Sequence, residues 1–97
     1  MAYWDRAGTE IDLVAESSDE RRLRLGSCKR NPDKLIRGLA VQEGHVQRFL
    51  SLHPRRYEGW SVERVAIAPK LDAAAREAIE AQGYIPQDLR DLTAGLR

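Results

Sequence analysis

The stretch Thr9–Lys29, TEIDLVAESSDERRLRLGSCK, decides the fold of this 97-residue chain. Apolar and polar residues alternate in Thr9–Ala15 and again in Arg22–Lys29, and this period of two is typical of strands with one buried face. The polar residues 16–20 separate the two segments and predict a turn. The stretch is therefore expected to form two strands of a sheet.

The polar side chains of these two strands are expected to meet. The alternation puts Glu10, Asp12 and Val14 on one face of the first strand, so two carboxylates share that face. In the second strand, one face changes from leucine to Ser27 and Lys29, which indicates that the core ends there and a cleft begins. Acidic and basic groups that face one cleft suggest a metal-dependent phosphodiesterase site.

A long helix is predicted after the second strand. The segment Asn31-Pro32-Asp33 is typical of a helix start, with an asparagine cap and proline at the first helical position. Apolar residues then recur at helical spacing as far as His53. Gly38 and Gly44 each lower helix propensity by about 1 kcal/mol relative to alanine. We therefore expect a kink or a close approach to the sheet near residues 42–45.

The remaining elements are shorter. Tyr3–Arg6 reads as a strand that turns into the next one, and Trp60–Ala68 as a strand with an apolar end. An alanine-rich helix is predicted over Asp72–Gln82, with Gly83 at its end, and residues 84–86 are expected to start a last short strand or an extended segment. The chain, residues 1–97, is long enough for one domain with a sheet and one or two helices, and too short for two independent cores.

Composition excludes several classes of protein. No run of eighteen apolar residues is present, so no membrane-spanning helix is expected, and the charged residues Asp5 and Arg6 argue against a signal peptide. The lone cysteine, Cys28, cannot form an internal disulfide. These features predict a cytoplasmic protein. Cys28 is expected to be a small buried residue on the face opposite Ser27 and Lys29, rather than a nucleophile.

The net charge of +1 conceals an asymmetry along the chain. Residues 21–64 carry eleven basic and four acidic side chains, whereas residues 1–20 carry one basic and six acidic. If the fold gathers the basic residues, they form a patch that faces the phosphates of a nucleic acid; otherwise they are scattered, solvated charges. The candidates for the patch are Arg21, Arg22, Arg24, Arg30, Lys34 and Arg37.

The order of these elements carries a resemblance to a known family. A hairpin, a strand with E-I-D, a strand with G-S-C-K, a helix and a further strand follow one another. This order resembles the core of the PD-(D/E)XK nuclease superfamily without its first helix. More narrowly, YWDRAGTEIDLVAE, GSCK and APKLDAAAREAIEAQGYIPQDLRDLT look like the nuclease-like domain at the C-terminus of archaeal and bacterial AAA-type ATPases. The resemblance covers almost the whole chain. It implies an α/β, restriction-endonuclease-like fold with a mixed central sheet flanked by helices, in which the first helix of the core is missing. The chain is expected to be the C-terminal part of a longer ATPase-like protein or a stand-alone fragment.

The resemblance also implies roles for matched positions. Asp12 matches the metal-binding aspartate, Lys29 matches the lysine that orients water and counters developing charge, and Glu10 matches an accessory acid. Ser27 departs from the family's G-E-C-K, in which the glutamate is an acid of the metal site, and the P-D dipeptide is also absent. Gln42 lies where some relatives carry a glutamine on the helix near the site.

Three functions therefore remain open. Mg²⁺ prefers hard oxygen ligands, and with Glu10 and Asp12 as the candidate ligands and a neutral Ser27 its binding is expected to be weak. The first hypothesis is a catalytically degenerate nuclease-like domain that binds nucleic acid or a partner such as an ATPase domain. The alternative is an active metal-dependent DNA endonuclease or resolvase-like enzyme that uses Glu10, Asp12 and Lys29. A third possibility is a homodimer formed through an unpaired sheet edge.

Overall fold

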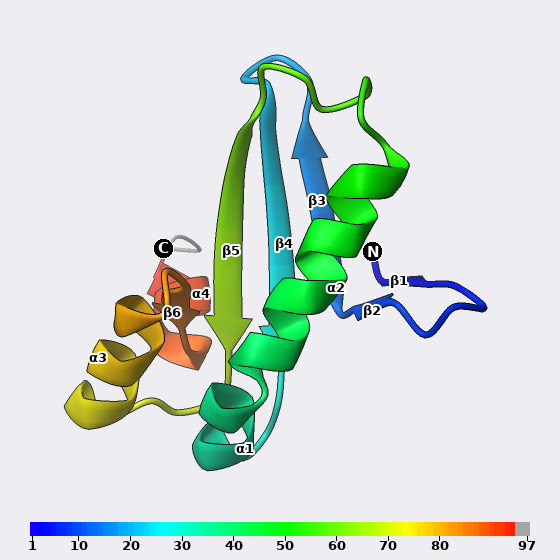
Figure 1. Ribbon diagram of the computed structural model, residues 1–97. Helices are drawn as coiled ribbons and strands as arrows, with labels where there is room; N and C mark the ends of the chain where they lie inside the picture. Colours follow the sequence, from blue (N-terminus) through cyan, green and yellow to red (C-terminus); the bar gives the residue numbers. More distant parts are fainter. Residues whose placement is uncertain (95–97) are drawn as a thin grey trace.

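Four strands form the central sheet in the order β3-β4-β5-β6 (Figure 1). They are β3 (Leu13–Ser17), β4 (Arg22–Cys28), β5 (Ser61–Ile67) and β6 (Ile85–Gln87). β3 and β4 are antiparallel, whereas β4, β5 and β6 are parallel to one another, so the predicted mixed sheet is confirmed. This computed structural model describes residues 1–94.

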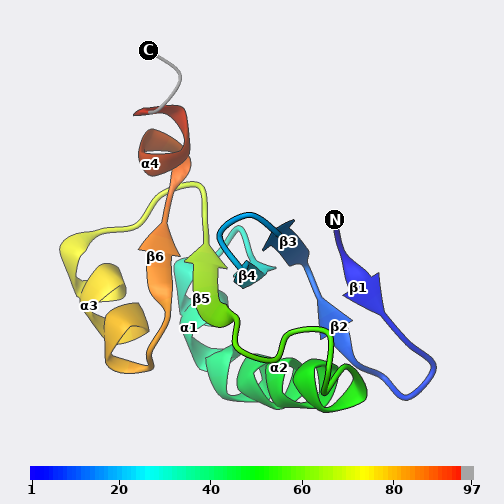
Figure 2. The same ribbon diagram turned by 90° about the horizontal axis from the view of Figure 1, so that it is seen from above.

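Within residues 1–94, four helices accompany the sheet. They are α1 (Pro32–Arg37), α2 (Leu39–Leu52), α3 (Ala73–Ala81) and α4 (Leu89–Ala94). Figure 2 shows α1 and α2 against one face of the sheet, with α4 on the other side beside β6. Within residues 1–94 no helix crosses the opposite face of β3 and β4 (Figure 2). The same part of the chain contains no helix long and apolar enough to cross a membrane.

The core lies between the sheet and the helices. Leu23 and Leu25 of β4 are fully buried, and they belong to one apolar cluster with Val46 and Phe49 of α2. Fully burying a leucine contributes about 1.5–3 kcal/mol. The alternation predicted for β4 is therefore correct, since the leucine face is the one that α2 covers.

Two further strands, β1 (Tyr3–Trp4) and β2 (Glu10–Ile11), form a small antiparallel sheet beside β3. The ring of Tyr3 packs edge-on against Phe49 of α2, with ring centroids 4.9 Å apart. This aromatic contact holds the hairpin against the helix and places β2 close to α2.

The predicted single strand Thr9–Ala15 is wrong, because the chain bends at Asp12 and divides it into β2 and β3. The carboxylate of Asp12 accepts a hydrogen bond from the backbone N–H of Cys28 at 2.9 Å. As a result Ile11 and Val14 both pack on the same apolar cluster, although a straight strand would point them to opposite faces. The bend turns Asp12 toward the end of β4.

The long predicted helix is likewise divided, but at Gly38 rather than near residues 42–45. The side chain of Asn31 caps α1 by accepting two backbone N–H groups, as predicted. A Cβ atom at Gly38 would lie 3.2 Å from the carbonyl oxygen of Lys34, so glycine permits this tight junction. Gly44 has open space around it and does not interrupt α2.

The pattern of the sequence does not predict α4. Its start depends on Asp88, which is buried and accepts hydrogen bonds from the backbone N–H groups of Arg90 and Asp91 at 2.9 and 3.2 Å. Asp88 also pairs with Arg76 of α3 at 2.8 Å. These contacts fix α4 next to the carboxyl end of β5, because the N–H of Leu71 also donates to Asp88.

Candidate functional site

A cavity of about 310 Å³ lies between the start of α2, the bend before β3 and the carboxyl end of β4. We call it the site cavity. Its walls include all four residues that the sequence singled out, namely Glu10, Asp12, Ser27 and Lys29. The structure therefore brings these side chains together, although they come from three different segments.

Hydrogen bonds to backbone groups hold Asp12 and Lys29 at the site cavity. Asp12 is fixed by the N–H of Cys28, which anchors the bend to the last residue of β4. The N–H of Lys29 donates to the carbonyl oxygen of Ile67 at 3.0 Å and extends the pairing of β4 with β5 by one residue. The exposed side chain of Lys29 thus starts from an ordered backbone at the mouth of the cavity.

The carboxylates of the site cavity are a poor fit to a complete Mg²⁺ site. Within residues 1–94 no group of three or more His, Cys, Asp or Glu side chains is placed to hold a metal ion. Ser27 is buried, with 6% of its surface exposed, and its hydroxyl is neutral. One oxygen of Asp12 already accepts the N–H of Cys28. Glu10 and Asp12 therefore stand without the third acid that the family pattern would supply.

Gln42 presents a buried hydrogen-bond donor to the site cavity. Gln42 of α2 lines the cavity and is only 7% exposed, and its amide nitrogen has no hydrogen-bond partner among the described residues. A buried donor without a partner costs about 1–3 kcal/mol. A polar ligand or a water molecule in the cavity would remove this cost. In the sequence, the position of Gln42 on the predicted helix was the signal that it lies near the site.

His45 also lines the site cavity, and sequence reasoning could not place it. Its Nδ1 accepts the backbone N–H of Glu10 at 3.4 Å, which links α2 to β2. His45 follows Gln42 by three residues and therefore lies on the same face of the helix. The three-residue spacing from Gln42 is the sequence signal that could have identified His45 as a residue of the site.

The expected burial of Cys28 is wrong. Cys28 does lie on the face opposite Ser27, but this face is uncovered and the residue is exposed. Its side chain lines an apolar pocket of about 230 Å³ with Ile67 and Leu89. Partial desolvation at this pocket raises the pKa of the Cys28 thiol, and the negative charge of Asp12 acts in the same direction. The thiol is therefore a weak nucleophile at neutral pH.

The six predicted basic residues do not form one patch. Arg22 and Arg24 lie at the start of β4 and pair with Glu63 at 3.0 and 3.2 Å, and the neighbouring Arg21 lies in the turn before them. A strand of seven residues is about 23 Å long, so this group is far from the end of β4.

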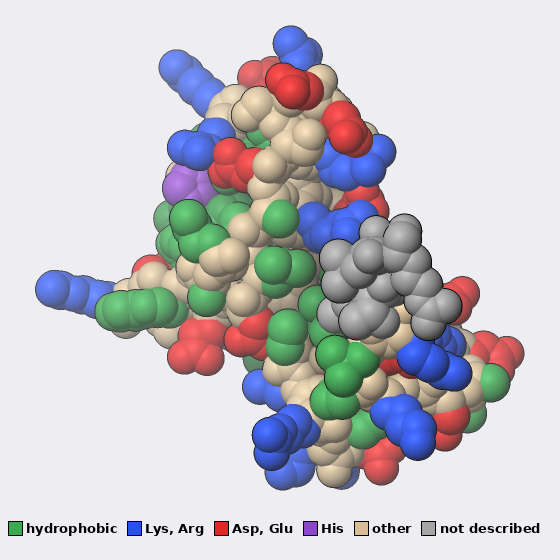
Figure 3. Space-filling model, turned by 180° about the vertical axis from the view of Figure 1, so that it is seen from behind, with side chains coloured by type: hydrophobic (Ala, Val, Ile, Leu, Met, Phe, Trp, Pro, Cys, Tyr) green, Lys and Arg blue, Asp and Glu red, His purple; other side chains and the backbone are tan. Residues whose placement is uncertain are grey.

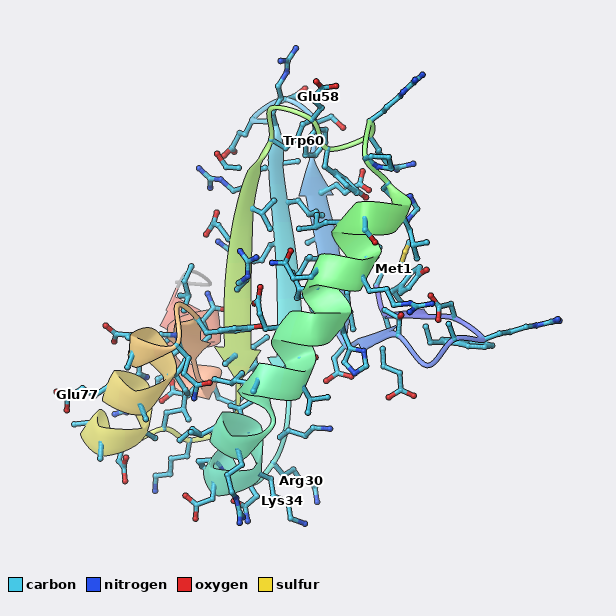
Figure 4. The ribbon with its side chains drawn as sticks, viewed as in Figure 1. Met1, Arg30, Lys34, Glu58, Trp60 and Glu77 are labelled. Carbon is cyan, nitrogen blue, oxygen red and sulfur yellow. The ribbon has the colours of Figure 1, made fainter. Side chains whose placement is uncertain are left out.

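The other three basic residues lie at the opposite end of the sheet. Figure 4 shows Arg30 and Lys34 at α1, far from Glu58 and Trp60 at the other end of the molecule. Arg37, also on α1, donates from its Nε to a backbone carbonyl of the same helix at 3.3 Å. Arg30, Lys34 and Arg37 therefore lie at the same end of the sheet as Lys29, which lines the site cavity.

No family model, no curated protein and no solved structure matches this chain. The resemblance to the PD-(D/E)XK superfamily stays a prediction from the sequence.

Proposed function

We propose that this chain is a nuclease-like domain with a degenerate metal site, and that it binds nucleic acid at the site cavity. The observation that carries the proposal is the convergence of Asp12, Lys29 and Gln42 on one cavity while Ser27 occupies the position of the missing acid. The order of strands and helices, with a mixed sheet followed by a helix over it, supports the restriction-endonuclease-like assignment.

The chemistry of the cavity suits binding better than hydrolysis. Metal-assisted cleavage of a phosphodiester needs an ion held by several oxygen ligands, and the carboxylates present are too few for a complete set. Binding of a phosphate needs cations and hydrogen-bond donors. Lys29 supplies a cation at the mouth, Arg30 and Lys34 supply two more nearby, and Gln42 supplies an unused donor.

A metal titration tests the degenerate site. Backbone NMR signals would be followed while Mg²⁺ or Mn²⁺ is added to the wild type and to Ser27→Glu. We expect perturbation around Asp12 in Ser27→Glu and little in the wild type, because the substitution restores a third carboxylate. Equal perturbation in both proteins would contradict a degenerate site.

The alternative is an active endonuclease that uses Glu10, Asp12 and Lys29, and it is favoured by the presence of Glu10 in the same cavity. It predicts nicking of DNA with Mg²⁺ or Mn²⁺ that disappears in Asp12→Asn. This variant keeps an oxygen that can accept the N–H of Cys28, so loss of activity would not reflect loss of the bend. We expect no nicking by the wild type.

A further inference from the structure

Three cavities follow one another around the carboxyl ends of β4 and β5. Lys29 lines both the site cavity and the apolar pocket at Cys28. Arg30 and Pro69 line both this pocket and a larger cavity of about 880 Å³. Ligands of open α/β sheets commonly bind outside the carboxyl ends of parallel strands. We call these three connected cavities the strand-end groove.

The largest cavity of the groove combines an apolar floor with unpaired cations. Its floor includes Pro32 and Ile36 of α1 and Leu71 before α3. Arg30 follows β4, Lys70 follows β5, and both line the cavity. Within residues 1–94 neither Arg30 nor Lys70 forms an ion pair. An anion with an apolar part would satisfy both features.

Two acids also line this cavity. The carboxylate of Asp72 accepts the N–H of Ala75 at 2.8 Å and caps α3, so it is already engaged. Asp33 lies in the first turn of α1. The positive charge that remains is modest, and electrostatic attraction alone would not select a ligand here. The apolar floor must therefore contribute to recognition.

An unpaired nucleotide has the required chemistry. Its base presents an apolar face, and its phosphate is attracted to cations. In a duplex the faces of the bases are stacked inside the helix and are not available to a protein floor. Figure 3, the view from behind, shows that hydrophobic side chains and Lys or Arg side chains lie near one another in the lower part of the molecule.

We propose that the strand-end groove binds single-stranded nucleic acid. One phosphate lies at Lys29 in the site cavity, and a neighbouring nucleotide occupies the large cavity, with its base on the floor and its phosphate at Arg30 and Lys70. This inference rests on the proposed function. It goes beyond that function because it names a single strand as the ligand and assigns a second subsite.

The test uses labelled oligothymidylates of two, four and eight nucleotides and measures affinity by fluorescence anisotropy at several salt concentrations. For the octamer, Lys70→Ala should reduce the slope of log K against log salt by about 0.7, the value for one phosphate contact with a single strand. The change should be smaller for the dimer, because dTpT carries a single phosphate and cannot place one phosphate at Lys29 and another at Arg30 and Lys70. Arg55→Ala, which removes an exposed arginine from the other end of the molecule, is the matched control and should leave the slope unchanged.

A second pair of variants tests the floor without changing charge. Ala74→Leu narrows the large cavity and should weaken binding of the octamer, whereas Ala81→Leu on the same helix lies outside the cavity and should not. Both alanines are exposed, so neither change disturbs the core. Ala74→Leu should leave the affinity for a blunt-ended duplex unchanged.

Several results would overturn the inference while the proposed function stands. If the wild type binds and the slope of log K against log salt is the same for Lys70→Ala and Arg55→Ala with every oligothymidylate, the second subsite does not exist. If duplex DNA binds as tightly as the octamer, and Ala74→Leu lowers both affinities equally, the groove has no preference for a single strand. Thymidine monophosphate that competes as well as the octamer would indicate a site for free nucleotides. Failure of every nucleic acid to bind at low salt would instead overturn the proposed function itself.

Discussion

The two ends of the sheet use their positive charges differently. At the end that carries the turn between β3 and β4, Arg22 and Arg24 pair with Glu63, and Arg56 pairs with Glu16 at 3.0 Å. At the end that carries the strand-end groove, Lys29, Arg30 and Lys34 form no ion pair within residues 1–94, whereas Arg90, which also lines the groove, pairs with Asp88 at 3.5 Å. We call these the turn end and the groove end.

The acids explain the difference. At the turn end, Glu16 and Glu63 lie on strands directly beside the arginines, and their carboxylates are free to pair with them. At the groove end, Asp12 accepts the N–H of a strand end, Asp72 caps α3, and Asp88 binds Arg76 and the start of α4. Glu10 and Asp33 also line the groove, and neither forms an ion pair within residues 1–94. Acids that are engaged with backbone N–H groups leave the nearby lysines available to an external anion.

The largest expected effect is on binding of nucleic acid. Replacing Lys29, Arg30 and Lys34 together by alanine should reduce the slope of log K against log salt for a single strand by about 2, since each lost phosphate contact removes about 0.7. Anisotropy titrations at several salt concentrations measure this slope.

The matched control replaces Arg22, Arg24 and Arg56 by alanine, which makes the same change in net charge at the turn end. This variant should bind nucleic acid almost as well as the wild type, because its arginines are neutralised by Glu16 and Glu63. Equal losses in the two triple variants would show that net charge alone governs binding, and the comparison of the two ends would fail.

The second effect is on stability at the turn end. The hydroxyl of Tyr57, a buried residue, donates to Glu16, and Tyr57→Phe removes this bond while it keeps the ring stacked on Phe49. We expect a loss of about 1.5 kcal/mol in the free energy of unfolding, which is typical of a hydrogen bond to a charged group. Urea unfolding measures it, and an unchanged midpoint would count against a stabilising role.

The third effect is a dependence on pH. The hydrogen bond from Tyr57 is the largest cause that lowers the pKa of Glu16, although desolvation opposes it. A carboxyl whose folded pKa is depressed stabilises the fold above its ordinary pKa, and this contribution disappears as pH falls through the depressed value. The stability difference between wild type and Glu16→Gln should therefore be present at about pH 7 and shrink below about pH 4. A difference that stays constant in thermal melts down to about pH 3 would contradict the assignment.

The smallest effect is expected for Lys34→Ala at the groove end. Lys34 is exposed and forms no ion pair within residues 1–94, so its loss should change the free energy of unfolding by less than about 0.5 kcal/mol. The same urea experiment as for Tyr57→Phe measures this value. A larger loss would mean that the cations of the groove end also hold the fold.

Several features of the fold follow from local patterns and were predicted correctly. The alternation over β4 identified Leu23 and Leu25 as core and Ser27 as the residue at the edge of the cleft. The cap at Asn31 also behaves as predicted, because its side chain accepts N–H groups only two and three residues away. Such patterns need no knowledge of distant segments.

Other features depend on distant contacts and were predicted wrongly. Thr9–Ala15 looked like a straight strand, but Asp12 bends it by binding the N–H of Cys28, sixteen residues away. The break of the helix at Gly38 has a local cause instead, because a Cβ atom there would lie 3.2 Å from the carbonyl oxygen of Lys34, whereas Gly44 faces open space and α2 continues through it. No periodic pattern along the sequence contains this information.

The sequence by itself determined β4, β5 and α3, the capped start of α1, and the residues Glu10, Asp12, Ser27 and Lys29 that meet in the site cavity. Hydrophobic periodicity and capping are local, so they can be read along the chain. Only the tertiary structure decided that the basic residues divide between two ends and that His45 joins the site. It also decided that Cys28 is exposed and that Arg30 and Lys70 line one cavity. Burial and charge pairing depend on which segments pack together, and that is a property of the whole fold.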